Sequence, residues 1–526
     1  MSDDGASGGK TIVDSVAVRM YRRLLGDCFL ITVKGHREGD ENEPVASYIL
    51  IDCGVLQGTN GAGDLMREVV QDIYAATGGK PLDLVIVTHE HHDHISGFGL
   101  ARTVFDTQHQ KAKALNQLWF AWTEDPADED ARTYQAKYGH AFATLAKLSE
   151  KLKIPTKAAG ASGELLGLAG FSGPLGLDRA PGAKPLRGSR AIYARLREWA
   201  GDGNTKYMSP GQVVTTPGDI GLTAYVLGPP RDNDFLTKSL PSSGANSETY
   251  LAMAGIGDTN GAQSQSPFPP RCRWRSDAEV KAAQKPSCDK DPVHWLHSRY
   301  YAPAAPCRGG VHKPKEGPAC RGDFSRHEPQ TYRRIDGTAR AAFSNLALRM
   351  DNNTNNTSLV VAFELPDDAG VMLFAADAQV GNWLSWEKVE YRTDPNAQPL
   401  PLTTASLLAR TKLYKVGHHG SHNATLRDKG LELMSDDLVA LIPTDAKFAL
   451  EQSSGWLMPN PRVDEALQAK THGRVLRGDI PSARTVAEHR KFDATRAGDF
   501  AGRITDNKVW VEYRIYSRSG QQEGNA

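Results

Sequence analysis

The sequence predicts an α/β fold, and three features support this prediction. Short apolar runs such as 47–52 (SYILID) and 81–87 (PLDLVIV) are typical of buried strands. Between them, residues 63–77 (GDLMREVVQDIYAAT) carry apolar side chains at helical spacing. Strand-like segments then return at 211–230, 357–379, 412–421, 438–443 and 509–516. A strand, a helix and a strand in this order indicate helices layered against sheets.

The chain begins with a predicted hairpin. Residues 16–24 (VAVRMYRRL) and 28–35 (CFLITVKG) are strand-like and flank Gly26-Asp27, a dipeptide typical of turns. Later segments divide the chain into one core with two long insertions. We expect core segments at 12–100, 205–231 and 346–517, a mainly helical insertion at 101–204, and an irregular basic insertion at 232–345.

The composition is that of an ordinary globular protein. Of the 526 residues, 40% are hydrophobic, and 62 Lys and Arg balance 62 Asp and Glu, which excludes a bulk polycation that coats DNA. The six cysteines are too sparse for a disulfide framework. No stretch approaches the roughly 20 apolar residues of a membrane-spanning helix, and the first residues do not resemble a secretory signal. We therefore expect a soluble, cytoplasmic protein without membrane contact; its oligomeric state is left open.

The strongest functional motif is THEHHDHISG at residues 88–97, directly after a predicted strand. His89 and His91 can point the same way and bind one ion, and Asp93 and His94 can bind a second. Imidazole and carboxylate groups suit zinc, and also manganese or iron. The alternative is a solvated loop that happens to be rich in histidine. The specific spacing after a strand favours a metal site.

This His-x-His-x-Asp-His motif resembles the metallo-β-lactamase superfamily. The resemblance implies an αββα sandwich that carries its metals at one edge. It also implies a role for Asp52, in ILIDCG, which resembles the family aspartate that orients the ligand loop by hydrogen bonds. An aspartate that caps the turn before Gly54 is compatible with the same role.

Two later segments resemble the ComEC-like branch, the hydrolase domain of a bacterial DNA-uptake protein. The segment NNTSLVVAFELPDDAGVMLFAADAQ implies that Asp377 bridges the two metals, although Ala376 stands where glycine is usual. The segment KVGHHGSHNAT implies that His418 completes the second metal, with His419 as the alternative ligand. Ser421 follows this pair and is either a contact to a substrate phosphate or an ordinary turn residue.

The chain departs from the family pattern at one point. Many members use a further histidine, between the first motif and the bridging aspartate, to complete the first metal. The candidates His294, His297, His312 and His327 all fall in the irregular insertion, where a surface or packing role is the simpler interpretation. The first metal would then have His89, His91, Asp377 and water as ligands.

The resemblance implies a hydrolase with two zinc ions, or manganese in their place. A metal-bound hydroxide would attack the substrate, with Asp93 and Asp377 as the catalytic carboxylates. The ComEC-like segments imply a phosphodiester substrate, in nucleic acid or a nucleotide. Two alternatives stay open: a hydrolase of small carboxylic esters, lactones or thioesters, and a non-catalytic metal-binding protein.

The second insertion offers a candidate substrate surface. Residues 271–334 contain 14 Lys and Arg against 7 Asp and Glu, with aromatic residues interleaved. Such a segment can follow a phosphodiester backbone and stack bases, although a solvated basic face would have the same composition. Arg271, Arg273 and Arg275 are the predicted start of this basic patch.

Overall fold

The computed structural model describes residues 11–137, 188–242, 247–250, 352–451 and 456–517. These residues all belong to one unit, formed by residues 1–252 and 346–526 of the chain. The predicted basic patch at Arg271, Arg273 and Arg275 lies outside the described residues, as do the four candidate histidines of the second insertion.

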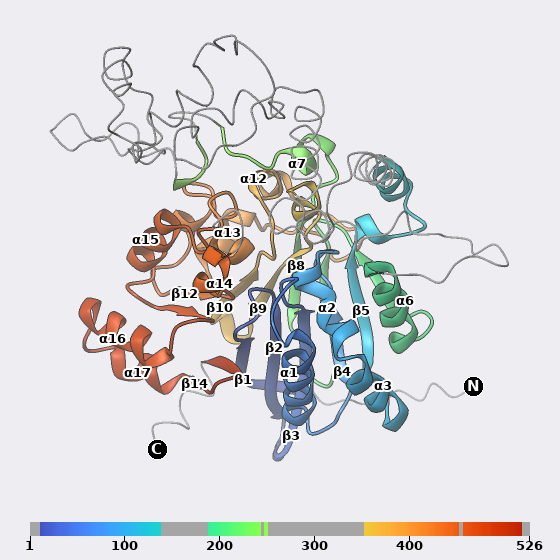
Figure 1. Cartoon of the computed structure of the whole chain (residues 1–526), viewed down its shortest axis with the longest axis horizontal. Coiled ribbons are helices and arrows are strands. Elements are labelled where there is room, and N and C mark those ends of the chain that lie inside the picture. The colour runs from blue at the N-terminus through green and yellow to red at the C-terminus, as the bar shows by residue number, and fades with distance from the viewer. Residues whose placement is uncertain (1–10, 138–187, 243–246, 251–351, 452–455, 518–526) are drawn as a thin grey trace, which may run out of the picture. The chain divides into compact units, whose positions relative to one another are not determined.

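Two β-sheets form the centre of this unit (Figure 1). The first sheet has the order β14-β15-β1-β2-β3-β4-β5-β6, and the second has the order β13-β12-β11-β10-β9-β8-β7. The strands of the first sheet are β1 (Thr11–Tyr21), β2 (Cys28–Arg37), β3 (Asp40–Cys53), β4 (Leu82–Ile86), β5 (Leu115–Ala121), β6 (Thr205–Met208), β14 (Ile504–Asp506) and β15 (Trp510–Tyr516). Those of the second are β7 (Val213–Thr215), β8 (Thr223–Gly228), β9 (Val360–Leu365), β10 (Gly370–Phe374), β11 (Thr411–Lys415), β12 (Val439–Ile442) and β13 (Val475–Arg477).

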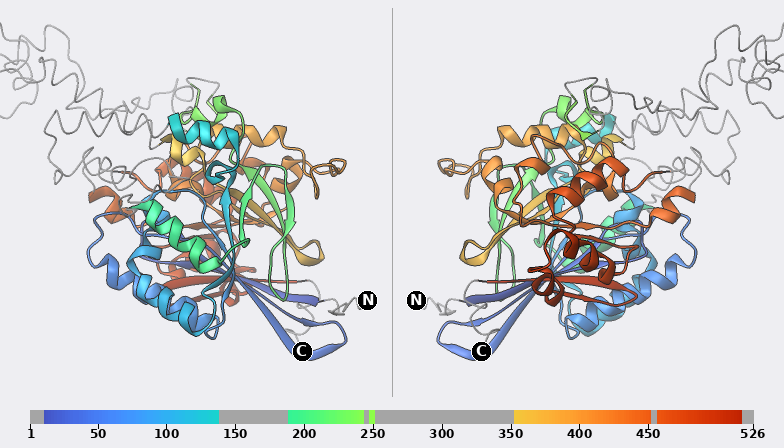
Figure 2. Two further views of the ribbon diagram at one scale, coloured as in Figure 1. Left: turned by 90° about the vertical axis from the view of Figure 1, so that its right-hand side faces the viewer. Right: turned by 90° about the vertical axis from the view of Figure 1, so that its left-hand side faces the viewer.

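Helices cover the outer face of each sheet, as two further views also show (Figure 2). On the first sheet these are α1 (Ala62–Ala76), α2 (His92–Leu100), α3 (Arg102–Lys111) and α6 (Ser189–Ala200). On the second they are α12 (Val380–Ser385), α13 (Thr404–Ala409) and α15 (Pro461–Lys470). The remaining helices are α7 (Asn233–Thr237), α14 (Ala446–Glu451), α16 (Ser482–Phe492) and α17 (Ala497–Gly502). The predicted α/β sandwich is confirmed.

The apolar runs of the sequence fill both faces of the sheets. In β3, Ile49 and Ile51 pack between the two sheets, whereas Tyr48 and Leu50 pack against the helices. Successive side chains of a strand point to opposite faces, so a strand covered on both sides must be apolar throughout. This burial explains why residues 47–52 show no alternation of apolar and polar residues.

The segment 101–204 differs from the predicted insertion. Strand β5 lies within it and pairs in parallel with β4 on one side and β6 on the other. Helices α3 and α6, from the same segment, pack on that sheet. Its strand, LNQLWFA, mixes polar and apolar residues at helix-like intervals, and this pattern concealed it from sequence analysis. Residues 138–187, between these elements, lie outside the described residues.

The first and last described strands lie side by side. Strand β15 pairs antiparallel with β1 and extends the first sheet, although it comes after the whole second sheet in sequence. Within the described residues, no helix combines the length and the apolar character needed to cross a lipid bilayer.

Candidate metal centre

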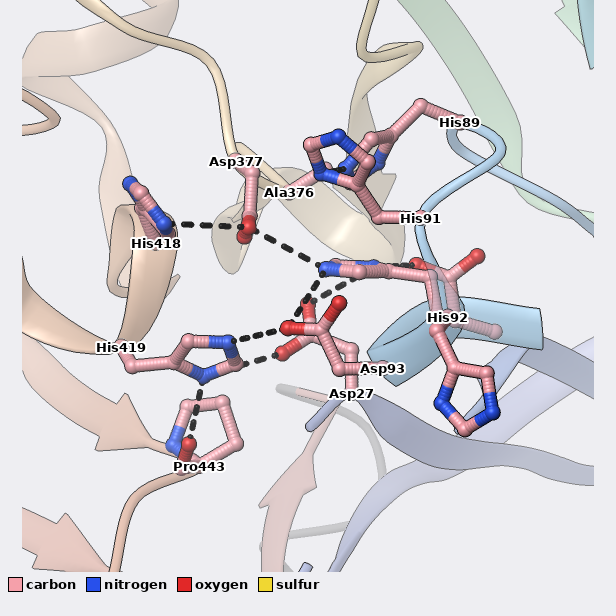
Figure 3. A network of polar contacts seen from close by, with 12 residues as sticks. Asp27, His89, His91, His92, Asp93, Ala376, Asp377, His418, His419 and Pro443 are labelled. Carbon is pink, nitrogen blue, oxygen red and sulfur yellow. Dashed lines mark hydrogen bonds and ion pairs between the residues drawn. The ribbon is translucent and has the colours of Figure 1, made fainter. Parts of the chain in front are cut away.

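Loops from both sheets meet at one edge of the sandwich. Strands β3 and β4 run in parallel, and so do β10 and β11. The carboxyl ends of parallel strands lie at the same edge, so the residues that follow these strands come together. Asp52 is near the end of β3, residues 89–94 follow β4, Asp377 follows β10, and His418 and His419 follow β11. Figure 3 shows side chains from separate segments converging, among them His91, Asp93, Asp377, His418 and His419.

Two glycines allow the ligand loop to sit close to the first sheet. A Cβ atom at Gly54 would lie 2.2 Å from the carbonyl carbon of Asp93, and one at Gly26 would lie 2.6 Å from the Asp93 carbonyl oxygen. Real Cβ atoms do not approach this closely, so only glycine fits at either position. The backbone amide of Asp27 donates a hydrogen bond to the Asp93 carbonyl at 2.9 Å, which fixes the loop.

His89 is held in one tautomer by its neighbours. The hydroxyl of Thr88 donates to Oδ2 of Asp52 at 2.6 Å, so its oxygen is left to accept from Nδ1 of His89 at 3.1 Å. That arrangement places the proton on Nδ1 and leaves the lone pair on Nε2. Nε2 lies 3.1 Å from Nδ1 of His91, so the two predicted ligands of the first ion face each other.

His94 is held in one tautomer in the same way, and it is more deeply buried than His89. Its Nδ1 donates to Oδ2 of Asp52 at 2.7 Å, and Asp52 also accepts from the backbone amide of Thr88 at 2.8 Å. Nε2 of His94 then faces Oδ2 of Asp377 at 3.2 Å. A lone pair that faces a carboxylate oxygen is repelled. The pair therefore needs a cation between the two atoms, either a proton or a metal ion.

His419 repeats this pattern on the opposite side. Its Nδ1 donates to the carbonyl of Pro443 at 2.7 Å, which leaves Nε2 facing Oδ2 of Asp93 at 3.1 Å (Figure 3). His418 lies beside it, with Nε2 3.7 Å from Oδ2 of Asp377. Both histidines of the predicted pair thus reach carboxylates of the cluster.

The backbone beside Asp377 is unusual. Ala376 has a φ of 48°, in the left-handed region that favours glycine. Its carbonyl accepts from the Lys415 ammonium at 2.8 Å and from the His418 amide at 3.0 Å. These bonds hold Ala376 in a conformation that costs roughly 1–2 kcal/mol for a residue with a side chain. The glycine expected at this position would avoid that cost.

Two members of the cluster were missed by sequence analysis, Asp27 and Lys415. Asp27 is 2% exposed and forms an ion pair with Lys415, whose Nζ also lies 3.5 Å from Oδ1 of Asp377. Asp27 had been assigned only to a hairpin turn. Lys415 lies at the apolar end of the strand TKLYK, and a lysine in such a position was the signal that could have indicated a buried acidic partner.

The charge balance and the shifted pKa values also indicate that the cluster needs cations. Four buried or nearly buried carboxylates (Asp27, Asp52, Asp93 and Asp377) face one lysine, so three negative charges are unmatched unless histidines are protonated or cations bind. Burial alone would raise the pKa of Asp377, but the charges of His94 and His418 hold it well below its ordinary value. Burial would lower the pKa of His94, yet the carboxylates around it raise that pKa well above the usual range.

The donor set fits a metal ion. One ligand atom each from Asp27, His94, Asp377 and His419 lie within 4.8 Å of one another. Nε2 of His94 and both carboxylate oxygens of Asp377 are buried and have no hydrogen-bond partner among the described residues. Nitrogen ligands about 2.0–2.1 Å from a tetrahedral zinc ion lie about 3.3 Å apart, close to the spacings found in this cluster.

The comparison with protein families agrees with this geometry. Residues 44–218 match the family model of the metallo-beta-lactamase superfamily, a range that contains β3, β4 and the 89–94 loop. This part of the chain is similar to the metallo-beta-lactamase superfamily. The similarity suggests a metallo-hydrolase. The search of curated proteins found no match to the chain.

The cluster also contains residues beyond the matched range. Asp377, His418 and His419 follow strands of the second sheet, and Lys415 is the last residue of β11. Two other residues stand apart from the cluster. His92 contacts the carbonyl of Val55 at 3.0 Å, and its ring points away from the other histidines (Figure 3). Ser421 is 6% exposed and donates to Oδ1 of Asn423 at 2.8 Å, which favours its alternative role as a turn residue.

Proposed function

We propose that this protein is a metal-dependent hydrolase that cleaves phosphodiesters in nucleic acid or nucleotides. The observation that carries the metal dependence is the pair of opposed contacts, His94 with Asp377 and His419 with Asp93. Each places an imidazole lone pair against a carboxylate at 3.1–3.2 Å. Two zinc or manganese ions held here would activate a water molecule and polarise the scissile bond.

Different residues of the cluster would bind the two ions and hold the ligands in place. His89 and His91 would hold the first ion, and Asp93, His94 and one histidine of the 418–419 pair would hold the second. The resemblance implies that Asp377 would serve both ions, and its Oδ2 lies 3.2 Å from Nε2 of His94 and 3.7 Å from Nε2 of His418. Asp52 would fix the direction of His94 through its bond to Nδ1, and Lys415 would hold Asp27 and Asp377 in place.

Support for a phosphodiester comes from two features of the sequence. The segments that carry Asp377 and His418 are similar to the ComEC-like branch, whose implied substrate is nucleic acid. Residues 271–334 add an excess of positive charge in the same chain. A polyanion bound by such a segment would release counterions, and its binding would weaken steeply as the salt concentration rises.

The test compares substrates on one metal-loaded preparation. The purified protein, supplied with zinc or manganese, should hydrolyse a chromogenic phosphodiester and single-stranded DNA, and Asp377→Asn should lose both activities. Replacing Arg271, Arg273 and Arg275 together by alanine should raise the Michaelis constant for DNA and flatten its salt dependence, while the small phosphodiester is cleaved as before. Faster hydrolysis of a lactone, thioester or carboxylic ester than of any phosphodiester would overturn the substrate assignment. Absence of all hydrolysis with metal bound would favour a non-catalytic metal protein.

A further inference from the structure

A cavity of about 620 Å³ lies at the opposite edge of the second sheet from the metal centre. Asp368 and Ala369 precede β10, Asp437 precedes β12, Arg474 precedes β13, and Lys412 is the second residue of β11. These positions are at the amino ends of the parallel strands, whereas the metal ligands follow the carboxyl ends. Lys412 and Lys415 are therefore about 10 Å apart along β11. The cavity is separate from the proposed active site.

Three cationic side chains of this cavity surround one carboxylate. Asp437 accepts an ion pair from Lys412 at 3.1 Å and from Arg496 at 3.1 Å. The hydrogen bond from Lys412 lowers the pKa of Asp437 against the opposing effect of burial, and the nearby charges of Arg496 and Arg474 lower it further. Arg496 reaches a second carboxylate, Asp493, at 3.5 Å, and the side chain of Arg496 is 64% exposed. Of the charged residues that line the cavity, four are positive and three are negative, which leaves a surplus of one positive charge: Lys412, Arg474, Arg496 and Arg503 against Asp368, Asp437 and Asp499.

Arg474 is the cation with the least compensation. It is only 7% exposed, and among the described residues no carboxylate lies within ion-pair distance of it. Its Nε donates to the Leu438 carbonyl at 3.2 Å and its Nη2 donates to the Asp436 carbonyl. Arg474 lines the cavity, and these two bonds use its Nε and Nη2 but not its Nη1. A buried guanidinium held only by carbonyls is a strong donor for an anionic ligand, and phosphate matches its geometry well.

A buried histidine of the same wall has an unused acceptor. His489 is 0% exposed, and its Nδ1 donates to the carbonyl of His472 at 2.8 Å. That bond leaves the lone pair of the neutral ring on Nε2, which has no hydrogen-bond partner among the described residues. A hydroxyl group of a ligand would satisfy this nitrogen. Phe500, Tyr513 and Tyr516 supply apolar surface in the same cavity.

The geometry points to a second binding site here, for a small phosphate monoester that carries hydroxyl groups. The phosphate, with nearly two negative charges at neutral pH, would contact Arg474, Arg496 and Lys412. A hydroxyl would donate to His489. The volume exceeds that of an inorganic phosphate ion and lies in the range of small-molecule sites. A sugar phosphate and a nucleotide share this chemistry, so both serve as probes.

The experiment is calorimetric titration of the full metal-loaded chain with ribose 5-phosphate, AMP and ribose. Saturable binding of ribose 5-phosphate or AMP, with no binding of ribose, is expected. Arg496→Ala should weaken binding by at least about tenfold, the loss expected for one charge-assisted hydrogen bond. Lys412→Gln tests the same wall through a second, partly exposed side chain. Tighter binding of AMP than of ribose 5-phosphate would identify a nucleotide site, and equal binding would identify a sugar-phosphate site.

Two controls locate the ligand. Arg462→Ala should leave binding unchanged, because Arg462 is 53% exposed, pairs with Glu465 at 3.5 Å much as Arg496 pairs with Asp493, and does not line the cavity. Asp377→Asn should also retain binding, since it alters only the metal centre. Binding that is lost in Asp377→Asn and kept in Arg496→Ala would place the ligand at the metals and overturn the proposal. No binding of either phosphate, or equal binding of ribose, would overturn it as well.

Discussion

Nε2 of His94 faces Oδ2 of Asp377 at 3.2 Å, although the two residues follow strands of different sheets and lie far apart in the chain. The contact joins the end of β4 to the end of β10. His94 cannot turn away, because its other nitrogen is bonded to Asp52 at 2.7 Å. A cation must therefore satisfy this pair, and the predictions below test which cation it is and what surrounds it.

Removing the shared carboxylate should release metal. We expect the wild-type protein to hold one to two equivalents of zinc or manganese, and Asp377→Asn to hold less than half as much. The amide has the size of the carboxylate but no charge to offset a bound ion. Elemental analysis after dialysis without chelator measures this. Asp367→Asn, on the turn between β9 and β10, is the control and should keep its metal. Unchanged metal content in Asp377→Asn would contradict the assignment.

The two adjacent histidines should differ in their effect on metal content. His419→Ala should remove about one equivalent, because the Pro443 carbonyl fixes its ring with Nε2 towards Asp93. His418→Ala should remove less, since its Nδ1 has no hydrogen-bond partner among the described residues to orient the ring. The two variants control for each other in the same metal analysis. The opposite order would assign the ligand role to His418.

Asp52 should tune metal affinity without binding the metal itself. It bonds to Thr88 and to Nδ1 of His94 and is fully buried. Asp52→Asn should weaken metal affinity by about 10–100-fold, the usual cost of losing such a supporting carboxylate. Competition with a chromogenic chelator measures the affinity, and the exposed Asp64→Asn is the control. A loss confined to folding stability, with unaltered affinity, would reduce Asp52 to a packing role.

Ala376→Gly should stabilise the protein by about 1 kcal/mol, because glycine adopts a φ of 48° without strain. Ala375 precedes it without a positive φ, so Ala375→Gly should instead lower the free energy of unfolding. Both values come from urea unfolding of metal-free protein. If the two variants lose stability equally, the backbone of Ala376 is not strained in solution.

Stability should depend on pH through Glu124. Burial, together with the charge of Glu90, raises the pKa of Glu124 from 4.5 to about 8. The folded state therefore favours the protonated form, and this contribution is complete below pH 4.5 and is lost as the pH rises through about 8. Glu124→Gln should flatten the fall in unfolding free energy over that range. Glu198→Gln, at a side chain that is 63% exposed, should follow the wild type. Identical slopes in all three proteins would refute the raised pKa.

Much of the fold could be predicted from local pattern. Apolar runs such as 47–52 and 81–87 indicated buried strands because a strand between two layers has apolar side chains on both faces. The spacing of His89, His91, Asp93 and His94 indicated metal ligands because four donors within six residues can reach one small volume. These features depend on neighbours in sequence, so the sequence by itself determined them.

The tertiary structure decided which segments, distant in sequence, contact one another. Strand β5 joined the first sheet because of its partners β4 and β6, which its mixed pattern did not reveal. Asp27 and Lys415 became part of the cluster because the start of β2 and the end of β11 meet beside the ligand loop. The cavity around Arg474 exists because α16, α17 and β15 close over the amino ends of the second sheet. Burial and charge balance arise from such contacts, and no local run of residues specifies them.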